Sequence, residues 1–238
     1  MNKENLTKVI AENSIYSRRK AEELIRSKRV LVNDKMAQLG EKVFIDDEIK
    51  VNGQKVIRNK KIYIKLNKPA GYVCTNKNFK GEKNIFSLIN IKEKVSSIGR
   101  LDKDSSGLLI LTNDGDLNYK LSHPKFEHNK TYLVIIKNNE QLKNKNFLSK
   151  LKNDFIKGIN IGEKTLAKAK KIEVVKDQNF KIILSEGKKR QIRRMFDFFD
   201  LKVESLKRTE FTGIKLDGLK EGQWKNLSKE EVEVLKKL

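Results

Sequence analysis

The sequence is poor in cysteine, proline and aromatic side chains. Its 238 residues include one cysteine and two prolines, and aromatic residues make up only 7%. A single cysteine, Cys74, excludes a disulfide within the chain and fits a reducing compartment. Because few aromatic rings are available, we expect a modest core built mainly of Leu, Ile and Val side chains.

The chain also lacks long apolar segments. No apolar run approaches the roughly 18 residues that a membrane-spanning helix requires. The first residues, Met1-Asn2-Lys3-Glu4-Asn5, are polar and do not resemble the apolar stretch of a secretory signal peptide. We therefore expect a soluble protein of the cytoplasm.

Several familiar ligand-binding motifs are missing from the sequence. No glycine-rich loop ends in Gly-Lys-Ser/Thr, which argues against a P-loop, and no Gly-x-Gly-x-x-Gly fingerprint of a dinucleotide site occurs. The only histidines, His123 and His128, have no cysteine or carboxylate pattern around them that resembles a metal site. We expect both to be surface or loop residues, and we expect no metal.

Negative charge is in short supply. The chain has 53 Lys and Arg against 31 Asp and Glu, which gives a formal net charge of +22. Such an excess attracts polyanions, and nucleic acid is the commonest polyanion inside a cell. Solubility, or a genome biased towards Lys and Asn, is the alternative explanation. DNA is the weaker choice of nucleic acid, because no helix-turn-helix or zinc-ligand pattern accompanies the charge.

Two helices followed by short strands are predicted for residues 1–57. Apolar residues repeat at helical spacing from Leu6, and Ser17 can cap a second helix. Strand-like runs ending in turn residues follow these helices. The polar run 58–61 is typical of a linker, so we expect a small N-terminal domain that ends at residue 57.

Residues 62–238 are expected to form a second domain, in which strands and helices interleave irregularly. The predicted strands are 62–66, 107–112, 130–137 and 180–184, and the predicted helices are 114–121, 140–150, 189–199 and one that begins after Ser228. The regular strand–helix repeat of a doubly wound parallel sheet is absent. The sequence therefore predicts an α+β fold, with a mixed, mainly antiparallel sheet and flanking helices.

A cluster of cations opens the second predicted helix of the N-terminal domain. The macrodipole disfavours positive charge at a helix N-terminus, so this placement suggests a function. Cations and free backbone amides there can converge on a phosphate, although a solvated charged face is the alternative. Residues 6–53 resemble the S4 RNA-binding domain, with a serine and basic residues at the second helix and a strand and turn after it. The basic residues of this segment are Arg18, Arg19, Lys20 and Arg29.

A loop rich in charged and small residues precedes the apolar run Gly107 to Thr112. Loops held by a rigid scaffold are a usual place for functional residues. Asp102 lies between Arg100 and Lys103, and nearby cations favour the ionised form of a carboxyl group. An ionised carboxylate is a competent nucleophile towards an electrophilic sugar carbon. From spacing alone, an Arg–Asp pair in a loop is structural more often than catalytic.

A third segment, Ser185–Phe196, is a glycine turn that leads into a predicted helix. Its apolar residues follow the i, i+3, i+4 spacing of a face directed to the core. Arg190, Arg193 and Arg194 form a neighbouring stripe. This arrangement fits docking onto RNA phosphates, or an arginine that reaches inward to a carboxylate.

Taken in order, these segments resemble the RsuA/RluB family of pseudouridine synthases. The resemblance covers nearly the whole chain, and the stretch from Gly99 to Asp116 is its most specific part. It implies an S4-like domain followed by a pseudouridine synthase domain. The matching pieces are Leu66–Val73, Gly99–Asp102, Lys130–Tyr132, Glu186–Met195 and Gly218–Trp224.

The resemblance implies an isomerase that converts a uridine of ribosomal RNA to pseudouridine without a cofactor or metal, with the large subunit slightly favoured. Asp102 matches the family's nucleophile, and Tyr132 matches the tyrosine that stacks on the target base. Arg193 matches the basic residue that pairs with the aspartate. Arg100 matches the residue that takes the place of the extruded nucleotide.

RNA is the partner that these features imply, and a monomer is the default expectation. Extruding a stacked uridine costs a few kcal/mol, which phosphate contacts could offset. The residues expected at phosphates are Arg18, Arg19, Lys20, Arg29, Lys188 and Arg190. The alternative function is a ribosome-assembly factor that binds RNA without catalysis, but such a factor has no reason to retain Asp102, Tyr132 and Arg193 together.

Overall fold

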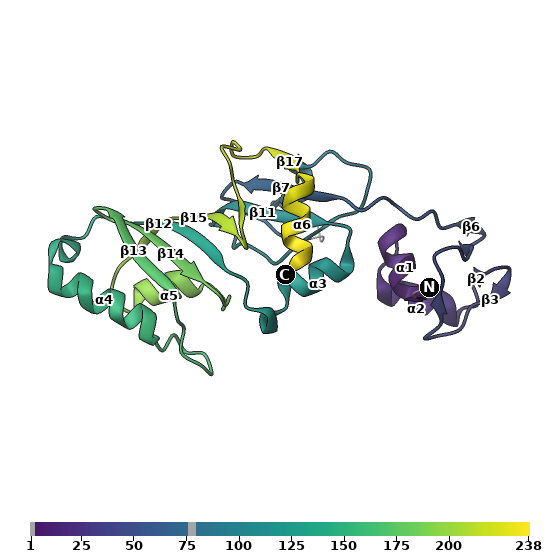
Figure 1. Cartoon of the computed structure of the whole chain (residues 1–238), viewed down its shortest axis with the longest axis horizontal. Coiled ribbons are helices and arrows are strands. Elements are labelled where there is room, and N and C mark those ends of the chain that lie inside the picture. Colours follow the sequence, from purple (N-terminus) through teal and green to yellow (C-terminus); the bar gives the residue numbers. More distant parts are fainter. Residues whose placement is uncertain (1–2, 76–79) are drawn as a thin grey trace. The chain divides into compact units, whose positions relative to one another are not determined.

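The computed structural model describes residues 3–75 and 80–238. The chain divides into two compact units. One consists of residues up to Ile62 together with Ile91–Ser96 and Thr112–Asp116, and the other contains the remaining residues. Figure 1 shows both units, and each is described by itself below. The domain limits expected at residues 57 and 62 stay a prediction.

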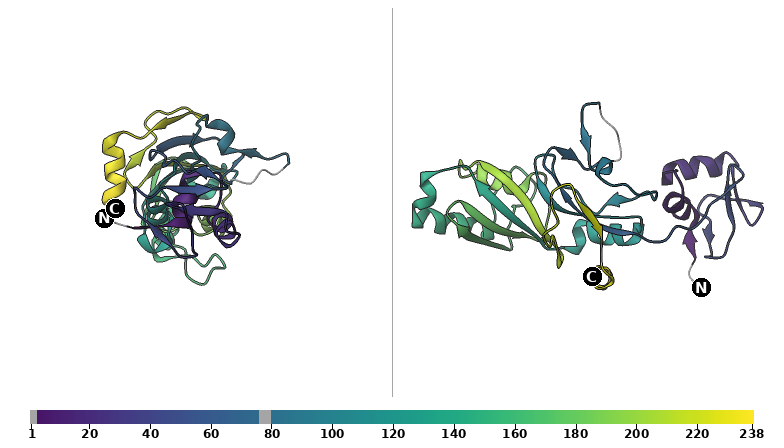
Figure 2. Two further views of the ribbon diagram at one scale, coloured as in Figure 1. Left: turned by 90° about the vertical axis from the view of Figure 1, so that its right-hand side faces the viewer. Right: turned by 90° about the horizontal axis from the view of Figure 1, so that it is seen from above.

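The N-terminal unit contains two short helices, α1 (Leu6–Asn13) and α2 (Arg18–Arg26). Asn5 caps α1 and Ser17 caps α2, since each side chain accepts a hydrogen bond from a backbone amide of the first turn. Short antiparallel strands complete the unit, as Figure 2 shows from above. These strands are β1 (Glu4–Asn5), β2 (Val30–Val32), β3 (Lys35–Met36), β4 (Lys42–Val43), β5 (Ile49–Val51) and β6 (Gln54–Lys55).

The C-terminal unit is built on one large sheet with the strand order β13-β14-β12-β15-β11-β7-β17. Strands β11 and β15 run parallel, whereas β12 runs antiparallel to both β14 and β15. Two small strands, β10 and β16, pair with its members. The strands are β7 (Tyr63–Lys68), β10 (Ser96–Ser97), β11 (Ser106–Thr112), β12 (Lys130–Ile136), β13 (Lys171–Lys176), β14 (Asn179–Leu184), β15 (Val203–Phe211), β16 (Ile214–Lys215) and β17 (Trp224–Asn226).

Helices pack on this sheet and close two apolar cores. The helices α4 (Lys145–Lys157) and α5 (Gln191–Asp197) cover the part formed by β12, β13 and β14 (Figure 1). The helices α3 (Gly115–Ser122) and α6 (Lys229–Lys237) belong to a second core beside β11. The remaining elements are the strands β8 (Tyr72–Val73) and β9 (Lys83–Asn84), and the 3-10 helices η1 (Ile85–Leu88), η2 (Pro124–Phe126) and η3 (Glu140–Lys143).

The α+β fold with a mixed, mainly antiparallel sheet is confirmed. Two predicted helices differ in extent. The helix expected at 140–150 is divided into η3 and the longer α4. The helix expected from residue 189 begins only at Gln191, because Arg190 has a φ of 50°, which no α-helix accommodates. The helix after Ser228 begins with the capping box that its Ser and Glu predict.

Candidate active site

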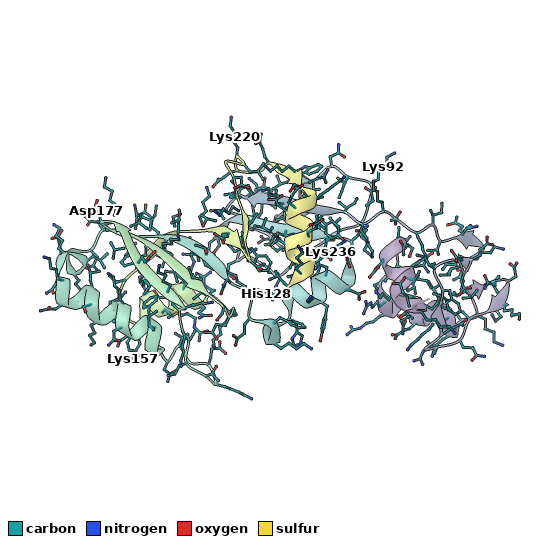
Figure 3. The ribbon with its side chains drawn as sticks, in the orientation of Figure 1. Lys92, His128, Lys157, Asp177, Lys220 and Lys236 are labelled. Atoms are coloured by element: carbon teal, nitrogen blue, oxygen red, sulfur yellow. The ribbon has the colours of Figure 1, made fainter. Side chains whose placement is uncertain are left out.

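A cavity of about 630 Å³ lies in the C-terminal unit. Its wall joins three segments that are far apart in the sequence, namely Ile98–Asp102, the start of β12 and Leu184–Ile192. His128, which is labelled in Figure 3, lines it from the segment between η2 and β12. A cavity of this volume is within the range of sites for small molecules or single nucleotides.

Five of the residues selected from the sequence line this cavity: Arg100, Asp102, Tyr132, Lys188 and Arg190. Asp102 and Tyr132 are half-buried, whereas Arg100 and Arg190 are exposed. The carboxylate and the aromatic ring expected to act on one base therefore share one wall. The structure leaves the expected phosphate-binding residues of the N-terminal unit, including Arg18, exposed on the surface of that unit.

The loop that carries Asp102 is folded around the ammonium group of Lys68. This lysine is completely buried, and its Nζ donates to the carbonyl oxygen of Ser105 at 2.6 Å. It also donates to the carbonyl oxygens of Asp102 at 3.1 Å, Lys103 at 3.3 Å and Pro69 at 3.1 Å. Burial lowers the pKa of Lys68, and nearby negative charges, among them Asp104 and Asp102, oppose that shift.

Arg193 does not make the ion pair that was expected of it. We expected Arg193 to pair with Asp102, but its Nε lies 3.4 Å from Oδ2 of Asp104. The two ends of the guanidinium donate to backbone carbonyl oxygens, those of Val203 at 3.1 Å and Asp104 at 3.0 Å. Because both ends of the guanidinium donate to backbone oxygens, Arg193 holds the loop that follows Asp102 rather than the Asp102 carboxylate.

Lys188 and Arg190 both have acidic partners at the rim of the cavity. Arg190 donates to both carboxylate oxygens of Asp104, at 3.0 and 2.9 Å. Lys188 pairs with Glu186. The Arg190–Asp104 pair is nearly half-exposed on both sides, so it contributes little to stability and an incoming phosphate can replace it. The role of Lys188 and Arg190 at RNA phosphates stays a prediction.

A β-bulge on β15 places Arg208 opposite Tyr132. On β12, Thr131 pairs with Glu210 of β15, whereas the next residue, Tyr132, pairs with Arg208, so the register skips Thr209. Such bulges turn side chains and are common beside active sites. Because directly opposed residues of an antiparallel pair project to the same face, Tyr132 and Arg208 lie side by side, and both line the cavity.

Two cations of the cavity wall, the buried Arg208 and the half-buried Lys130, were not predicted as site residues. Arg208 is only 2% exposed and donates through Nε to the carbonyl oxygen of Leu108 at 2.7 Å. Lys130 donates to the carbonyl oxygens of His128 at 2.8 Å and Ser185 at 3.4 Å. Burial, followed by the positive charge of Arg208, lowers the pKa of Lys130 to about 8.

Neither a metal site nor a membrane span is found in the part of the chain that the structure describes. Within residues 3–75 and 80–238, no group of three or more His, Cys, Asp or Glu side chains could hold a metal ion. No helix of these residues has both the length and the apolar character needed to cross a bilayer.

The similarity to known proteins identifies the family. Residues 62–198 match the family model of RNA pseudouridylate synthases, and residues 5–49 match that of the S4 domain. The first match alone covers more than half of the chain. The chain belongs to the RNA pseudouridylate synthase family. It is a pseudouridine synthase, an isomerase, and it carries an S4 RNA-binding domain.

Curated relatives match over almost the full length. The ribosomal large subunit pseudouridine synthase B of Bacillus subtilis is 42% identical over 242 residues, covering 99% of this chain and 96% of the relative. The dual-specificity RNA pseudouridine synthase RluF of Escherichia coli K12 is 38% identical, covering 98% and 78% of the two chains. A crystal structure of a pseudouridylate synthase superposes with a TM-score of 0.68 at 32% identity, covering 97% and 99%.

Sequence reasoning found the motifs of this pseudouridine synthase but not all of its polar residues. Lys68 was named only as a member of the matching piece Leu66–Val73, although its place directly after the predicted strand 62–66 and Asn67 could have indicated a buried cation. Lys130 was likewise named only as a member of the matching piece Lys130–Tyr132. Arg208 lies in a strand that the apolar pattern did not indicate, so no sequence feature pointed to it.

Proposed function

We propose that this pseudouridine synthase converts a specific uridine of large-subunit ribosomal RNA to pseudouridine, with Asp102 as the nucleophile. The observation that carries the proposal is the common cavity, whose wall holds Arg100, Asp102 and Tyr132 together. The choice of ribosomal RNA follows from the similarity to the Bacillus subtilis enzyme, whose name gives the large ribosomal subunit.

The reaction is balanced within one nucleotide. The bond between N1 of uracil and C1′ of ribose breaks, and a bond between C5 and C1′ forms. C5 loses its proton and N1 gains one, so the product is an isomer and no external reagent is consumed. The Asp102 carboxylate forms a transient bond either to C1′ or to the base, and either route regenerates the free carboxylate.

The surroundings of Asp102 suit a nucleophile that must be aimed. Its carboxylate lies on a loop whose backbone is held by Lys68 on one side and by Arg193 on the other. Hydrogen bonds to the backbone restrain the loop and leave the carboxylate free to react. Tyr132 projects from a strand of the sheet, so the ring has a rigid support from which it can stack on the uracil.

The target uridine must leave its stack to reach such a cavity. We propose that it is flipped out and that Arg100, exposed at the rim, occupies the space it vacates. The S4 domain supplies affinity and register through its exposed cations, and the C-terminal domain carries out the chemistry. Tyr132 then replaces the stacking that the flipped base has lost.

Replacement of Asp102 by asparagine tests the proposal. Asp102→Asn retains the shape of the side chain but removes its charge, so we expect pseudouridine formation to fall at least about 1,000-fold. The RNA dissociation constant should stay within about threefold of wild type, because phosphate contacts dominate affinity. Single-turnover assays on a large-subunit ribosomal RNA transcript, with filter binding alongside, measure both quantities.

Asp177→Asn is the matched control, since Asp177 (labelled in Figure 3) lies in the turn between β13 and β14 and does not line the cavity. It should retain full activity. Full activity of Asp102→Asn would refute the nucleophile. If the wild-type chain forms no pseudouridine but binds the RNA, the alternative function of a non-catalytic assembly factor replaces the proposal. Mapping pseudouridines in total RNA from cells without the protein identifies the target.

A further inference from the structure

The cavity wall has an excess of positive charge. It contains six Lys and Arg residues against three Asp and Glu residues. Two of these cations, Lys188 and Arg190, have carboxylate partners. Lys130 and Arg208, which lie deeper, pair with no carboxylate among residues 3–75 and 80–238. Of the other cations of the wall, Arg100 and Lys189 are exposed, so Lys130 and Arg208 are the two that are withdrawn from solvent, and the proposed mechanism does not use them.

Arg208 is a buried charge that is incompletely satisfied. Its side chain is 98% buried, and its Nη2 has no hydrogen-bond partner within the described residues. The contacts it makes are to the carbonyl oxygen of Leu108 and, at 5.3 Å, to the ring of Phe211. Neither contact carries a negative charge. Buried charges in proteins are normally paired, so an orphaned guanidinium nitrogen beside a cavity points to an anion that arrives with the ligand.

Lys130 stands on the same face of the sheet as Arg208. It is two residues before Tyr132 on β12, and side chains at i and i+2 of a strand project to the same face. Tyr132 is directly opposite Arg208. The hydrogen bonds of Lys130 go to two neutral carbonyl oxygens. The two cations are close enough for the charge of Arg208 to lower the pKa of Lys130.

We propose that Lys130 and Arg208 form an anion-binding subsite in the cavity, which receives a phosphate group bonded to the ribose of the nucleotide that faces Asp102 and Tyr132. The identity of this ligand rests on the proposed function, because phosphate is the anion that RNA supplies. Two fixed cations on one sheet face hold the phosphate by charge-assisted hydrogen bonds. The phosphate thereby fixes the ribose in the cavity, while Tyr132 fixes the base.

Binding of small nucleotides to the whole chain tests the subsite without turnover. The probes are uridine, uridine 3′-monophosphate and uridine 5′-monophosphate, titrated calorimetrically at pH 7.5. We expect at least one monophosphate to bind about tenfold or more tightly than uridine, as a charge-assisted pair predicts. The ester that shows this gain identifies whether the 3′ or the 5′ phosphate of the nucleotide enters the subsite.

Lys130→Met should abolish most of the gain in affinity of the monophosphate over uridine, and it should leave the affinity for uridine unchanged. Lys189→Met is the matched control, because it removes the same charge from an exposed lysine of the same cavity wall. It should retain the gain. Arg208→Met should act as Lys130→Met does, and its thermal melt reports whether it folds. Lys130→Met decides the question alone if the Arg208 variant does not fold.

The pH dependence gives a second readout. Burial and then the charge of Arg208 lower the pKa of Lys130 to about 8, and Glu186 opposes this shift. As the pH rises from 7.5 to 9.5, Lys130 loses its charge, whereas a phosphate monoester with a second pKa of about 6 keeps its charge. The ratio of monophosphate to uridine affinity should therefore fall over this interval in the wild type. It should stay flat in Lys130→Met.

The subsite is refuted if neither monophosphate binds better than uridine. The same result is expected if the Asp102 carboxylate, and not a phosphate, is the partner of Lys130 and Arg208. The subsite is equally refuted if Lys189→Met loses as much of the gain as Lys130→Met, since general attraction would then explain it. Binding is measured without catalysis. A chain that forms no pseudouridine can still pass this test, and an active chain can fail it.

Discussion

At the scale of single residues, the position of Asp102 depends on a lysine that never reaches the cavity surface. Lys68→Met removes the ammonium that holds four carbonyl oxygens. Displacement of a reacting group by about 1 Å costs on the order of 100-fold, so we expect the single-turnover rate to fall by about that factor. RNA affinity should change by less than about threefold. Rate and binding measurements on one transcript distinguish these effects.

Lys103→Met provides the comparison for Lys68. Lys103 lies in the same loop, but it is exposed and pairs with Glu82 at 3.0 Å, so its loss should leave the rate within about twofold. Equal rates for the wild type and Lys68→Met would show that the loop is held without the lysine. A thermal melt of Lys68→Met checks that the assay temperature lies below unfolding.

The same scale shows how far residue roles can be read from a sequence. The resemblance to the RsuA/RluB family pointed to Asp102 and Tyr132, and both line the cavity. The partner of Arg193 could not be found in this way, because Asp102 and Asp104 lie two residues apart and carry the same charge. Rotamers and the loop conformation decide between them, and the pair forms with Asp104. Arg208 was missed since its importance arises from strand pairing and not from neighbours in the sequence.

At the scale of elements, the cavity depends on the close approach of β11 and β15 at Gly107. Its φ is 104°, and a Cβ atom there would lie 2.2 Å from the backbone oxygen of Arg208. Gly107→Ala combines backbone strain with a clash against a main chain that cannot rotate away. Each of these effects costs roughly 1–3 kcal/mol, so we expect at least about 2 kcal/mol less stability by urea unfolding.

Gly187→Ala is the glycine control for that measurement. A Cβ atom at Gly187 meets no atom within 4 Å, and its backbone does not have a positive φ. Its free energy of unfolding should therefore equal or slightly exceed that of the wild type. If Gly107→Ala were as stable as Gly187→Ala, the parallel contact of β11 with β15 would not constrain residue 107.

Elements were predictable where one physical rule dominated. The fully buried strand β11 and the capped helix α6 have strong local patterns, and both were found from the sequence. Strand β15 was not predicted, because its charged residues obscure any alternation and only a few of its side chains are buried. The start of α5 was placed too early, since a left-handed Arg190 has no signature in composition.

At the scale of the whole molecule, two features matter for RNA binding: the net charge of +22 and the division into two compact units. The charge was evident from composition and indicates a polyanionic partner. Composition could not assign that charge to particular surfaces, because lysine is abundant along the entire chain. The S4 match covers residues 5–49, so the cations of this segment are the natural candidates for sequence-independent contacts with RNA.

The salt dependence of RNA binding tests this assignment. In the triple variant Arg18→Gln, Arg19→Gln and Lys20→Gln, three exposed cations are lost from the start of α2. Each phosphate contact contributes about 0.7–0.9 to the slope of log K against log salt concentration, so the slope should fall by about 2 to 3. The capping bond from Ser17 to the Lys20 amide is unaffected, and the helix should persist.

The control variant removes the same charge from α4, with Lys145→Gln, Lys150→Gln and Lys157→Gln, all of which are exposed. Because net charge changes equally in the two triple variants, any difference in slope reports local contacts rather than the overall field. We expect the α4 variant to change the slope by less than about 1. Equal slopes for the two variants would mean that the S4 domain attracts RNA only as part of a uniformly basic surface.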